Sequence, residues 1–439
     1  MVISYYTLNK YSETGNKKEK LTSLGSEAYQ TFLNLTESKE GPLISTGIYP
    51  IYTQVDNLEK TSLPIQVHPA ANFREKLIQR LGISGYEVED PNKLPKDLRT
   101  KEWEQLISWI ENFDSYCKEK KYRIIALLNR MGFYNISLKL IPNFSNEEIK
   151  TDFFLARLAS KKAMALYKTK KTKDNTLLKI LAHTNYKENY IQFGAAISLL
   201  VDYAKKRDMS QVKFWADLAK EEYKKIKIDN DPIAILQSSI FYRAYAYLPF
   251  LSEDQSTVGK YMHKALMYAE KFYLNSPEYE LIAKENLHPI YETNIKIAMW
   301  RNDLQDANFY AKKLTELDPY DPKVYLHLGD TYRVLNRLDD AILTYMKCFN
   351  IGHPFSAYSS FLIGHCFERL GDFSNACEWY VTSLEYEPYS ISALEKLKIC
   401  SQKENINYLS EFADKRLLEI DKLKKKVLQG EYKHESKLS

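Results

Sequence analysis

One pattern of residues occurs twice in succession between Pro322 and Pro388. Each copy has leucine or isoleucine before a glycine, an aromatic residue three positions later, then alanine with tyrosine four positions later, and finally proline. The first copy comprises Tyr325, Leu328, Gly329, Tyr332, Ala341, Tyr345 and Pro354, and the second comprises Ile363, Gly364, Phe367, Ala376, Tyr380 and Pro388. A unit of about 35 residues cannot bury its apolar face alone, so successive copies must stack.

The sizes of the repeated residues predict pairs of closely crossing helices. The glycines and alanines of the pattern allow two helices to approach, and the tyrosine and phenylalanine side chains fill the gaps between successive pairs. Each proline ends the second helix of its unit, because proline lacks the backbone N–H and clashes with the preceding turn.

This order of residues resembles the tetratricopeptide repeat (TPR), a helix-turn-helix unit. The first-position tryptophan of that family is replaced by Tyr325 and by Ser360 in the two copies. The resemblance is clear over residues 288–388, and degenerate TPR-like helix pairs precede it. It implies a mainly α fold, a TPR-like α-solenoid of antiparallel helix pairs.

A step of twelve or thirteen residues from alanine to proline extends the repeat toward the amino terminus. The step occurs from Ala265 to Pro277, from Ala307 to Pro319, from Ala341 to Pro354 and from Ala376 to Pro388. Successive alanines are 42, 34 and 35 residues apart, so the spacing is regular only from Ala307. We therefore expect three regular units from about His288 to Leu384.

Glycine and proline usage indicates how the chain is divided. Only 14 glycines and 15 prolines occur in 439 residues, which favours long helices with short connections. Several of them lie between short β-prone runs before residue 98, so residues 1–98 are expected to form an irregular or small α+β segment. The segments expected after it are degenerate helical repeats over 99–287, TPR repeats over 288–400, a capping helix over 401–429 and a disordered tail over 430–439.

Apolar periodicity and one capping motif locate the helices of residues 99–287. Apolar residues at three- and four-residue steps from Trp103 to Cys117 mark one helix face, and a second helix is expected at Tyr122–Leu140. Ser145 and Glu148 form a capping box that begins the next helix. Paired helices are then expected at 190–207 with 211–226, and at 232–248 with 257–272.

The end of the chain has the features of a cap. A short helix at 390–400 begins a further unit, which is not completed. The charged helix after it carries one apolar stripe, which a solenoid needs to cover its last exposed face. The stripe consists of Leu409, Phe412, Leu417, Ile420, Leu423 and Val427.

Charge and cysteine usage limit the environment and the partners. The formal net charge of +5 is too weak to create a field that gathers nucleic acid, which argues against such a partner. Five cysteines are scattered without paired spacing, as expected for reduced thiols in a cytoplasmic protein. No run of about 18 apolar residues occurs, so we expect no membrane-spanning segment.

Compact catalytic and metal-binding motifs do not occur in the sequence. It has no Gly-rich phosphate loop, His-Glu-x-x-His, Cys-x-x-Cys or Gly-x-Ser-x-Gly motif. His365, Cys366 and Cys377 are not expected to form a metal site, because adjacent residues of a helix point about 100° apart. We therefore expect a protein without enzyme activity, catalytic residues, metal or cofactor.

The resemblance to TPR proteins locates a candidate binding surface. In that family the first helix of each unit lines a concave groove that holds peptides of a partner. The matching positions here are Lys296 in the first clear unit, Lys323, Leu326, Asp330 and Arg333 in the second, and Tyr358, Phe361, His365, Glu368 and Arg369 in the third. TPR modules that bind the carboxy-terminal carboxylate of chaperones use a Lys, Asn and Arg clamp. No asparagine occurs at these positions, so a mixed groove of this kind would suit a different peptide.

The function favoured by these features is a protein-protein interaction scaffold or adaptor that binds a partner protein or peptide in the groove. One alternative is a peptide-sensing regulator of an enzyme or transcription factor. Another is an enzyme or maturation factor with its site in or next to residues 1–98. The sequence leaves the partner and the oligomeric state open.

Overall fold

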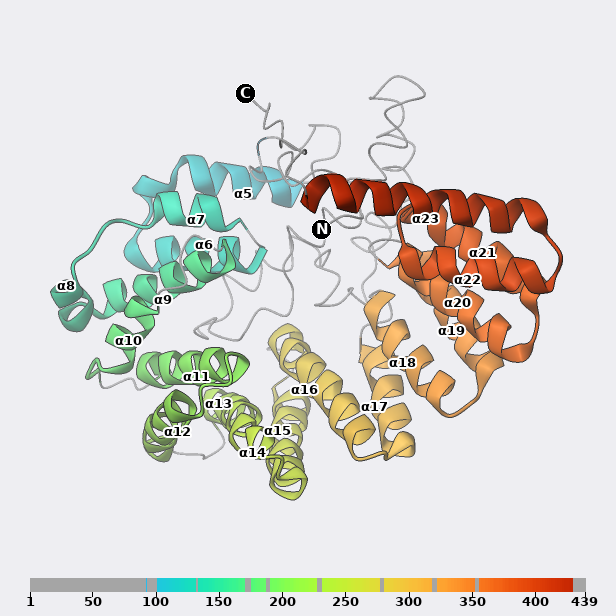
Figure 1. Cartoon of the computed structure of the whole chain (residues 1–439). Coiled ribbons are helices and arrows are strands. Elements are labelled where there is room, and N and C mark those ends of the chain that lie inside the picture. Colours follow the sequence, from blue (N-terminus) through green and yellow to red (C-terminus); the bar gives the residue numbers. More distant parts are fainter. Residues whose placement is uncertain are drawn as a thin grey trace. The chain divides into compact units, whose positions relative to one another are not determined.

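The structure is a computed structural model that describes Asn92 and residues 101–428 (Figure 1). Within that span it leaves out residues 132, 170–174, 187–189, 227–230, 277–279, 318–321 and 352–354. All regular elements of the described residues are helices, which confirms the mainly α fold. The segment expected at 1–98, Asn92 apart, and the tail expected at 430–439 lie outside the described residues.

The described helices fall into two compact units, which meet in sequence at residue 321. The first unit contains α5 (Lys101–Glu111), η4 (Phe113–Ser115), α6 (Lys118–Met131), α7 (Tyr134–Leu140), α8 (Asn146–Thr151), α9 (Phe153–Lys168), α10 (Thr176–Ala182), α11 (Tyr190–Lys205), α12 (Met209–Lys224), α13 (Pro232–Tyr245), α14 (Tyr247–Leu251), α15 (Gln255–Asn275), α16 (Glu280–Trp300) and α17 (Leu304–Leu317). The second unit contains α18 (Pro322–Val334), α19 (Leu338–Ile351), α20 (Ser356–Leu370), α21 (Phe373–Tyr386), α22 (Ile391–Lys403) and α23 (Asn407–Leu428).

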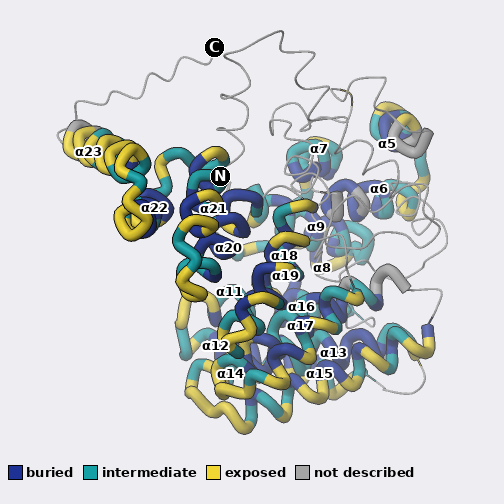
Figure 2. Tube along the Cα trace, turned by 90° about the vertical axis from the view of Figure 1, so that its right-hand side faces the viewer, coloured by how far each residue is buried: buried dark blue, intermediate teal, exposed yellow. Residues whose placement is uncertain are grey.

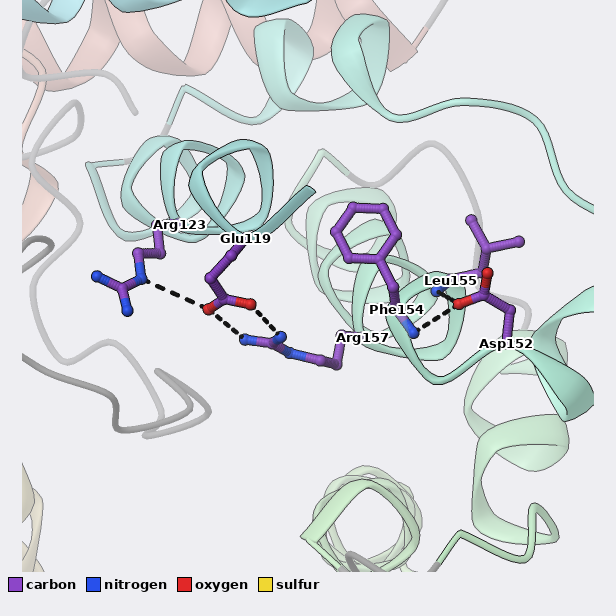
Figure 3. Close-up of polar contacts among 6 residues, drawn as sticks. All are labelled: Glu119, Arg123, Asp152, Phe154, Leu155 and Arg157. Atoms are coloured by element: carbon purple, nitrogen blue, oxygen red, sulfur yellow. Dashed lines mark hydrogen bonds and ion pairs between the residues drawn. The ribbon is translucent and has the colours of Figure 1, made fainter. Parts of the chain in front are cut away.

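The first helices of the first unit differ in detail from the pattern read in the sequence. The helix expected at Tyr122–Leu140 is two helices, because the backbone turns at Phe133, whose side chain is buried in the core. The capping box is confirmed, since Ser145 and Glu148 exchange side-chain and backbone hydrogen bonds. The helix that the capping box begins ends at Thr151, because Asp152 begins a new helix. The Asp152 carboxylate caps that helix by accepting hydrogen bonds from the backbone amides of Phe154 and Leu155 (Figure 3).

Two further features of the first unit were not read from the sequence. The short helix α10 precedes the helix pair expected at 190–226, and no separate helix was predicted there. Pro289 lies inside α16, so the first helix of this pair begins well before His288, the expected start of the unit.

One turn conformation joins the two helices in six successive pairs. Each turn has one residue with positive φ, and the N–H of the residue after it donates to the carbonyl five positions earlier. The positive-φ residues are Arg207, Glu253, Asn302, Asn336, Gly371 and Asn405, and the donors are Asp208, Asp254, Asp303, Arg337, Asp372 and Ile406. This bond is the Schellman termination of a helix. The degenerate pairs and the last pair, α22 and α23, therefore share the turn of the clear repeats.

The repeated turn gives a stability prediction at Glu253. A left-handed conformation costs a residue with a Cβ atom about 1 kcal/mol, and glycine avoids that cost. Because Glu253 is exposed with φ 58°, Glu253→Gly should raise the free energy of unfolding by about 0.5 to 1 kcal/mol in urea titrations. Gly371→Ala, at φ 81°, should lower it by a similar amount. A stabilising Gly371→Ala would contradict the account.

Close helix crossings in the second unit occur at the two glycines of the repeated pattern. A Cβ atom built on Gly329 would lie 2.3 Å from the ring of Tyr345, and one on Gly364 would lie 3.0 Å from the ring of Tyr380. Both tyrosines are fully buried. Of the other pattern residues, Leu328 is buried. The remainder are buried or half-buried in the same cores, namely Tyr325, Tyr332, Ala341, Ile363, Phe367 and Ala376.

The last helix covers the end of the second unit with part of the expected stripe. Ile420 is buried, and Leu409 and Leu417 pack partly against the core formed by α21 and α22. Phe412 is exposed, as are most of the described residues of α23 (Figure 2). No helix among the described residues is long and apolar enough to cross a membrane.

Candidate functional site

Three helices of the second unit surround a hollow of about 450 Å³. They are α18, α20 and α22, the first helices of three successive pairs. The lining residues are Arg333 from α18, Tyr358, Phe361, Leu362 and His365 from α20, and Ser392, Glu395, Lys396 and Ile399 from α22. A hollow of this size fits the range of ligand-binding sites in proteins.

Apolar side chains form much of the surface of the hollow. Tyr358 is 49% exposed and Ile399 is 44% exposed, although both are large. Leu362 is buried in the core of α18, α19 and α20. Phe361 is partly buried against that core and contacts the ring of Tyr380. The hollow therefore offers apolar contacts that a partner side chain could bury.

Arg333 is held at the edge of the hollow by its own helix and the next. Its guanidinium donates to the Asp330 carboxylate at 3.2 Å and lies 3.4 Å from the Tyr345 hydroxyl. The same hydroxyl donates to Asp330 at 2.8 Å. Asp330 therefore binds both the repeat tyrosine and the groove arginine, and it does not line the hollow.

Lys396 is held in the same way on the other side. Its ammonium donates to Glu368 at 2.8 Å, and the Tyr380 hydroxyl donates to the other oxygen of that carboxylate at 2.7 Å. Burial alone would raise the pKa of Glu368, but the hydrogen bonds from Lys396 and Tyr380 hold it below its usual value. Glu368 is therefore ionised at neutral pH and does not line the hollow.

His365 lies on the wall of the hollow with a lowered pKa. Burial lowers it most, Glu368 opposes the shift, and the positive charges of Lys396, Arg333 and Arg369 lower it further. Because the pKa lies below the ordinary value of 6.5, the imidazole is neutral at pH 7. The permanent positive charges of the lining are therefore Arg333 and Lys396.

Six of the residues that the sequence predicts for the groove line the hollow or pair with its cations. Arg333, Tyr358, Phe361 and His365 come together in the hollow, and Asp330 and Glu368 hold its two cations.

The other expected groove residues do not line the hollow. Leu326 is buried in the core and Lys323 is half-buried on α18. Arg369 donates to the Arg333 carbonyl at 3.1 Å and to the Asn336 side chain at 2.7 Å, so it joins α20 to the neighbouring turn. Lys296 is exposed on α16 of the first unit.

The residues of the hollow contributed by α22 were not read from the sequence. Ser392, Glu395, Lys396 and Ile399 follow Tyr358, Phe361, Leu362 and His365 by 34 residues each, the length of one repeat. Adding 34 residues to the expected groove positions Tyr358, Phe361 and His365 would have found Ser392, Glu395 and Ile399. It would not have found Lys396, because the matching residue, Leu362, was not among the expected positions.

The lining residues that the structure describes include no cysteine and one carboxylate, Glu395. Among the described residues, no three or more His, Cys, Asp or Glu side chains are grouped as a metal ion would require. Cys366, next to His365 in sequence, is fully buried and points into the core, and burial raises the pKa of its thiol to about 11. The lining combines apolar surface with fixed charges.

Comparison with known protein families agrees with the helix pairs. The model of the tetratricopeptide repeat matches residues 322–351 and 357–390. Residues 322–390 are therefore tetratricopeptide repeats, and the fold is a TPR-like α-solenoid. The matched residues end just before α22, which completes the hollow. No curated protein is significantly similar in sequence to the chain.

Several solved structures are similar to the chain at low identity. The human IFIT1 dimer with PPP-AAAA is 15% identical, covers 92% of this chain and 99% of its own, and has a TM-score of 0.41. The Cut9 and Hcn1 hetero-tetramer of the APC/C is 13% identical, with coverages of 84% and 92% and a TM-score of 0.28. MamA is 19% identical, with coverages of 39% and 96% and a TM-score of 0.31. None of these values supports a transfer of function.

Proposed function

We propose that the protein is an interaction scaffold or adaptor that binds a segment of a partner protein in the hollow formed by α18, α20 and α22. The observation that carries the proposal is the exposure of Tyr358 and Ile399 beside two fixed cations in one hollow. Large apolar side chains that line a preformed concavity are typical anchors for a partner. The tetratricopeptide repeats of residues 322–390 support the same kind of function.

The rigidity of the lining supports capture of a partner without a large rearrangement. Asp330 and Glu368 fix the two cations, and each carboxylate is itself fixed by a buried tyrosine hydroxyl. Burial raises the pKa of both hydroxyls, so they remain hydrogen-bond donors. A site whose side chains are already ordered loses less entropy when it binds a partner.

The proposal is tested by affinity capture from the lysate of the native organism. The full-length chain is compared with the double variant Tyr358→Ala with Ile399→Ala, which removes the exposed apolar surface of the hollow. A matched variant, Leu343→Ala with Met346→Ala, removes exposed apolar side chains from α19, outside the hollow. We expect a partner that the wild type and the matched variant retain and that the groove variant loses by about tenfold or more.

The opposite result would place binding elsewhere. If the groove variant retains its helicity and captures the same proteins as the wild type, the hollow is not the interaction site.

We also propose that the protein works in the cytoplasm. Four of the five cysteines, Cys348, Cys366, Cys377 and Cys400, are buried free thiols. Burial raises the pKa of Cys377 to about 11 and that of Cys400 to about 12, which keeps both thiols protonated and unreactive. Thiols in this state suit a reducing compartment, and fractionation of the native cells tests the location.

A further inference from the structure

We infer that the hollow takes a partner segment in which a bulky apolar side chain stands next to an aspartate or glutamate, with that carboxylate bound between Arg333 and Lys396. The inference rests on the proposed function and names the chemistry of the partner. It also makes α22, which lies outside the matched repeats, a determinant of specificity.

The distribution of charge around the hollow supports an acidic partner. Arg333 and Lys396 line it, whereas the carboxylates that pair with them, Asp330 and Glu368, do not. Each of these carboxylates also accepts a hydrogen bond from a buried tyrosine hydroxyl. Of the lining residues, Glu395 is the one that carries negative charge. An occupant of the hollow therefore meets two cations and one carboxylate among the lining residues.

Both cations keep hydrogen-bonding capacity for an incoming group. Within the part of the chain that the structure describes, the Arg333 side chain makes two hydrogen bonds, and a guanidinium has more donors than two. The Lys396 ammonium makes one, to Glu368, and an ammonium has more donors than one. A bound carboxylate would add charge-assisted hydrogen bonds without breaking the existing pairs, and such bonds are about twice as strong as neutral ones.

The charges that act on His365 agree with a carboxylate as the bound group. Three cations, from α18, α20 and α22, act on the imidazole against one carboxylate, Glu368. Positive charges of three helices therefore act at this wall of the hollow, although the Glu368 carboxylate is the strongest single charge acting on the imidazole. Tyr358 and Ile399 supply the apolar surface beside it, which suits an apolar side chain adjacent to the acidic one.

The test is selection of random dodecapeptides displayed on phage, with the full-length chain immobilised. The peptides are fused to the coat protein through their carboxyl ends, so a bound carboxylate must come from a side chain. We expect the enriched peptides to share an aromatic or aliphatic residue next to Asp or Glu. A synthetic copy should bind equally well as the free acid and as the carboxy-terminal amide.

Two lysines of α22 give a matched pair of variants. Lys396→Gln removes the lining ammonium, and Lys398→Gln removes an ammonium that pairs with Asp414 of α23 at 2.6 Å. Each variant loses one ion pair, so both report on the cost of that loss to folding. We expect Lys396→Gln to weaken the selected peptide by about tenfold and Lys398→Gln to leave its affinity unchanged.

The outcomes separate this inference from the proposed function. Peptides that need Tyr358 and Ile399 but show no acidic preference, or that bind Lys396→Gln as well as wild type, would overturn the inference and leave the groove as the binding site. A free-acid copy that binds while its amide does not would also overturn it, because the ligand would then be a chain end. Peptides that bind equally to Tyr358→Ala with Ile399→Ala, or the absence of any enriched peptide, would count against both.

Discussion

Gly329→Val is expected to lower the free energy of unfolding of the second unit by about 3 kcal/mol. The Cβ atom of any replacement would lie 2.3 Å from Tyr345 Cε1 and within 2.8 Å of two more ring atoms. The ring cannot retreat easily, because it is fully buried and its hydroxyl donates to Asp330. The substitution therefore forces α18 and α19 apart.

Two measurements check this prediction. Urea unfolding of the full chain should show a destabilised transition, and hydrogen exchange followed by mass spectrometry should show lost protection in α18 and α19 first, since repeats depend mainly on their neighbours. The alanine variants Gly329→Ala and Gly364→Ala serve as a matched pair, because the Cβ atom at position 364 would lie 3.0 Å from the Tyr380 ring and needs a smaller adjustment than the one at position 329. Equal losses for Gly329→Ala and Gly364→Ala would contradict the account.

Arg157→Ala is expected to destabilise the first unit by about 2 kcal/mol. The Arg157 guanidinium donates to both oxygens of Glu119, at 2.7 and 3.1 Å (Figure 3). It also lies 3.7 Å from the centre of the Tyr122 ring, and 17% of the side chain is exposed. The expected loss combines the stacking on Tyr122 with an ion pair that solvent weakens, because the Glu119 side chain is 48% exposed.

The ion-pair part of this effect should depend on pH. The hydrogen bond from Arg157 lowers the pKa of Glu119 below 4.5, against the opposing effect of burial. A carboxyl with a lowered folded pKa adds stability above its unfolded pKa, and that stability is lost as the pH falls through the folded pKa. The gap in unfolding free energy between wild type and Arg157→Ala should therefore narrow from pH 7 to about pH 3.

Arg123→Ala serves as the control for this prediction. Arg123 makes a longer bond to the same carboxylate, at 3.4 Å, and the loss of that bond should cost well under 1 kcal/mol. A loss for Arg123→Ala as large as that for Arg157→Ala would contradict the assigned role of stacking on Tyr122.

The regular repeats could be predicted from the sequence because their packing depends on few residue sizes. A glycine that faces a buried tyrosine across a helix crossing leaves little choice of residue, and Gly329 with Tyr345 shows this. The capping box at Ser145 could be predicted for a similar reason, since its two hydrogen bonds need these side chains at this spacing.

The details that could not be predicted depend on local competition or on tertiary contacts. The apolar periodicity predicted α6 and α7 as one helix. Gly132 stands between them in the sequence, and glycine weakens a helix interior. Asp152 caps α9, and this ended the helix that the capping box began. The turn residues Arg207 and Glu253 carry no signal for positive φ in their side chains, so the shared turn of the degenerate pairs was visible only in the structure.

Part of the lining of the hollow could be predicted from the sequence. Tyr358, Phe361 and His365 could be found from the repeat register, whereas the other wall belongs to α22, where the pattern of glycine and tyrosine is lost. Side chains on the surface of a groove are not fixed by packing in the core. The repeat register therefore predicts which positions face the groove, but not which residues their side chains contact.

Site-specific photo-crosslinking tests whether a partner binds in the hollow between α18, α20 and α22. Benzoylphenylalanine is placed at Tyr358, which lines the hollow, and in a second variant at Leu343, which is 62% exposed on α19 outside it. We expect one partner that crosslinks from position 358, does not crosslink from position 343, and is lost when Ile399→Ala is added. The same partner crosslinked from position 343 but not from position 358 would contradict it.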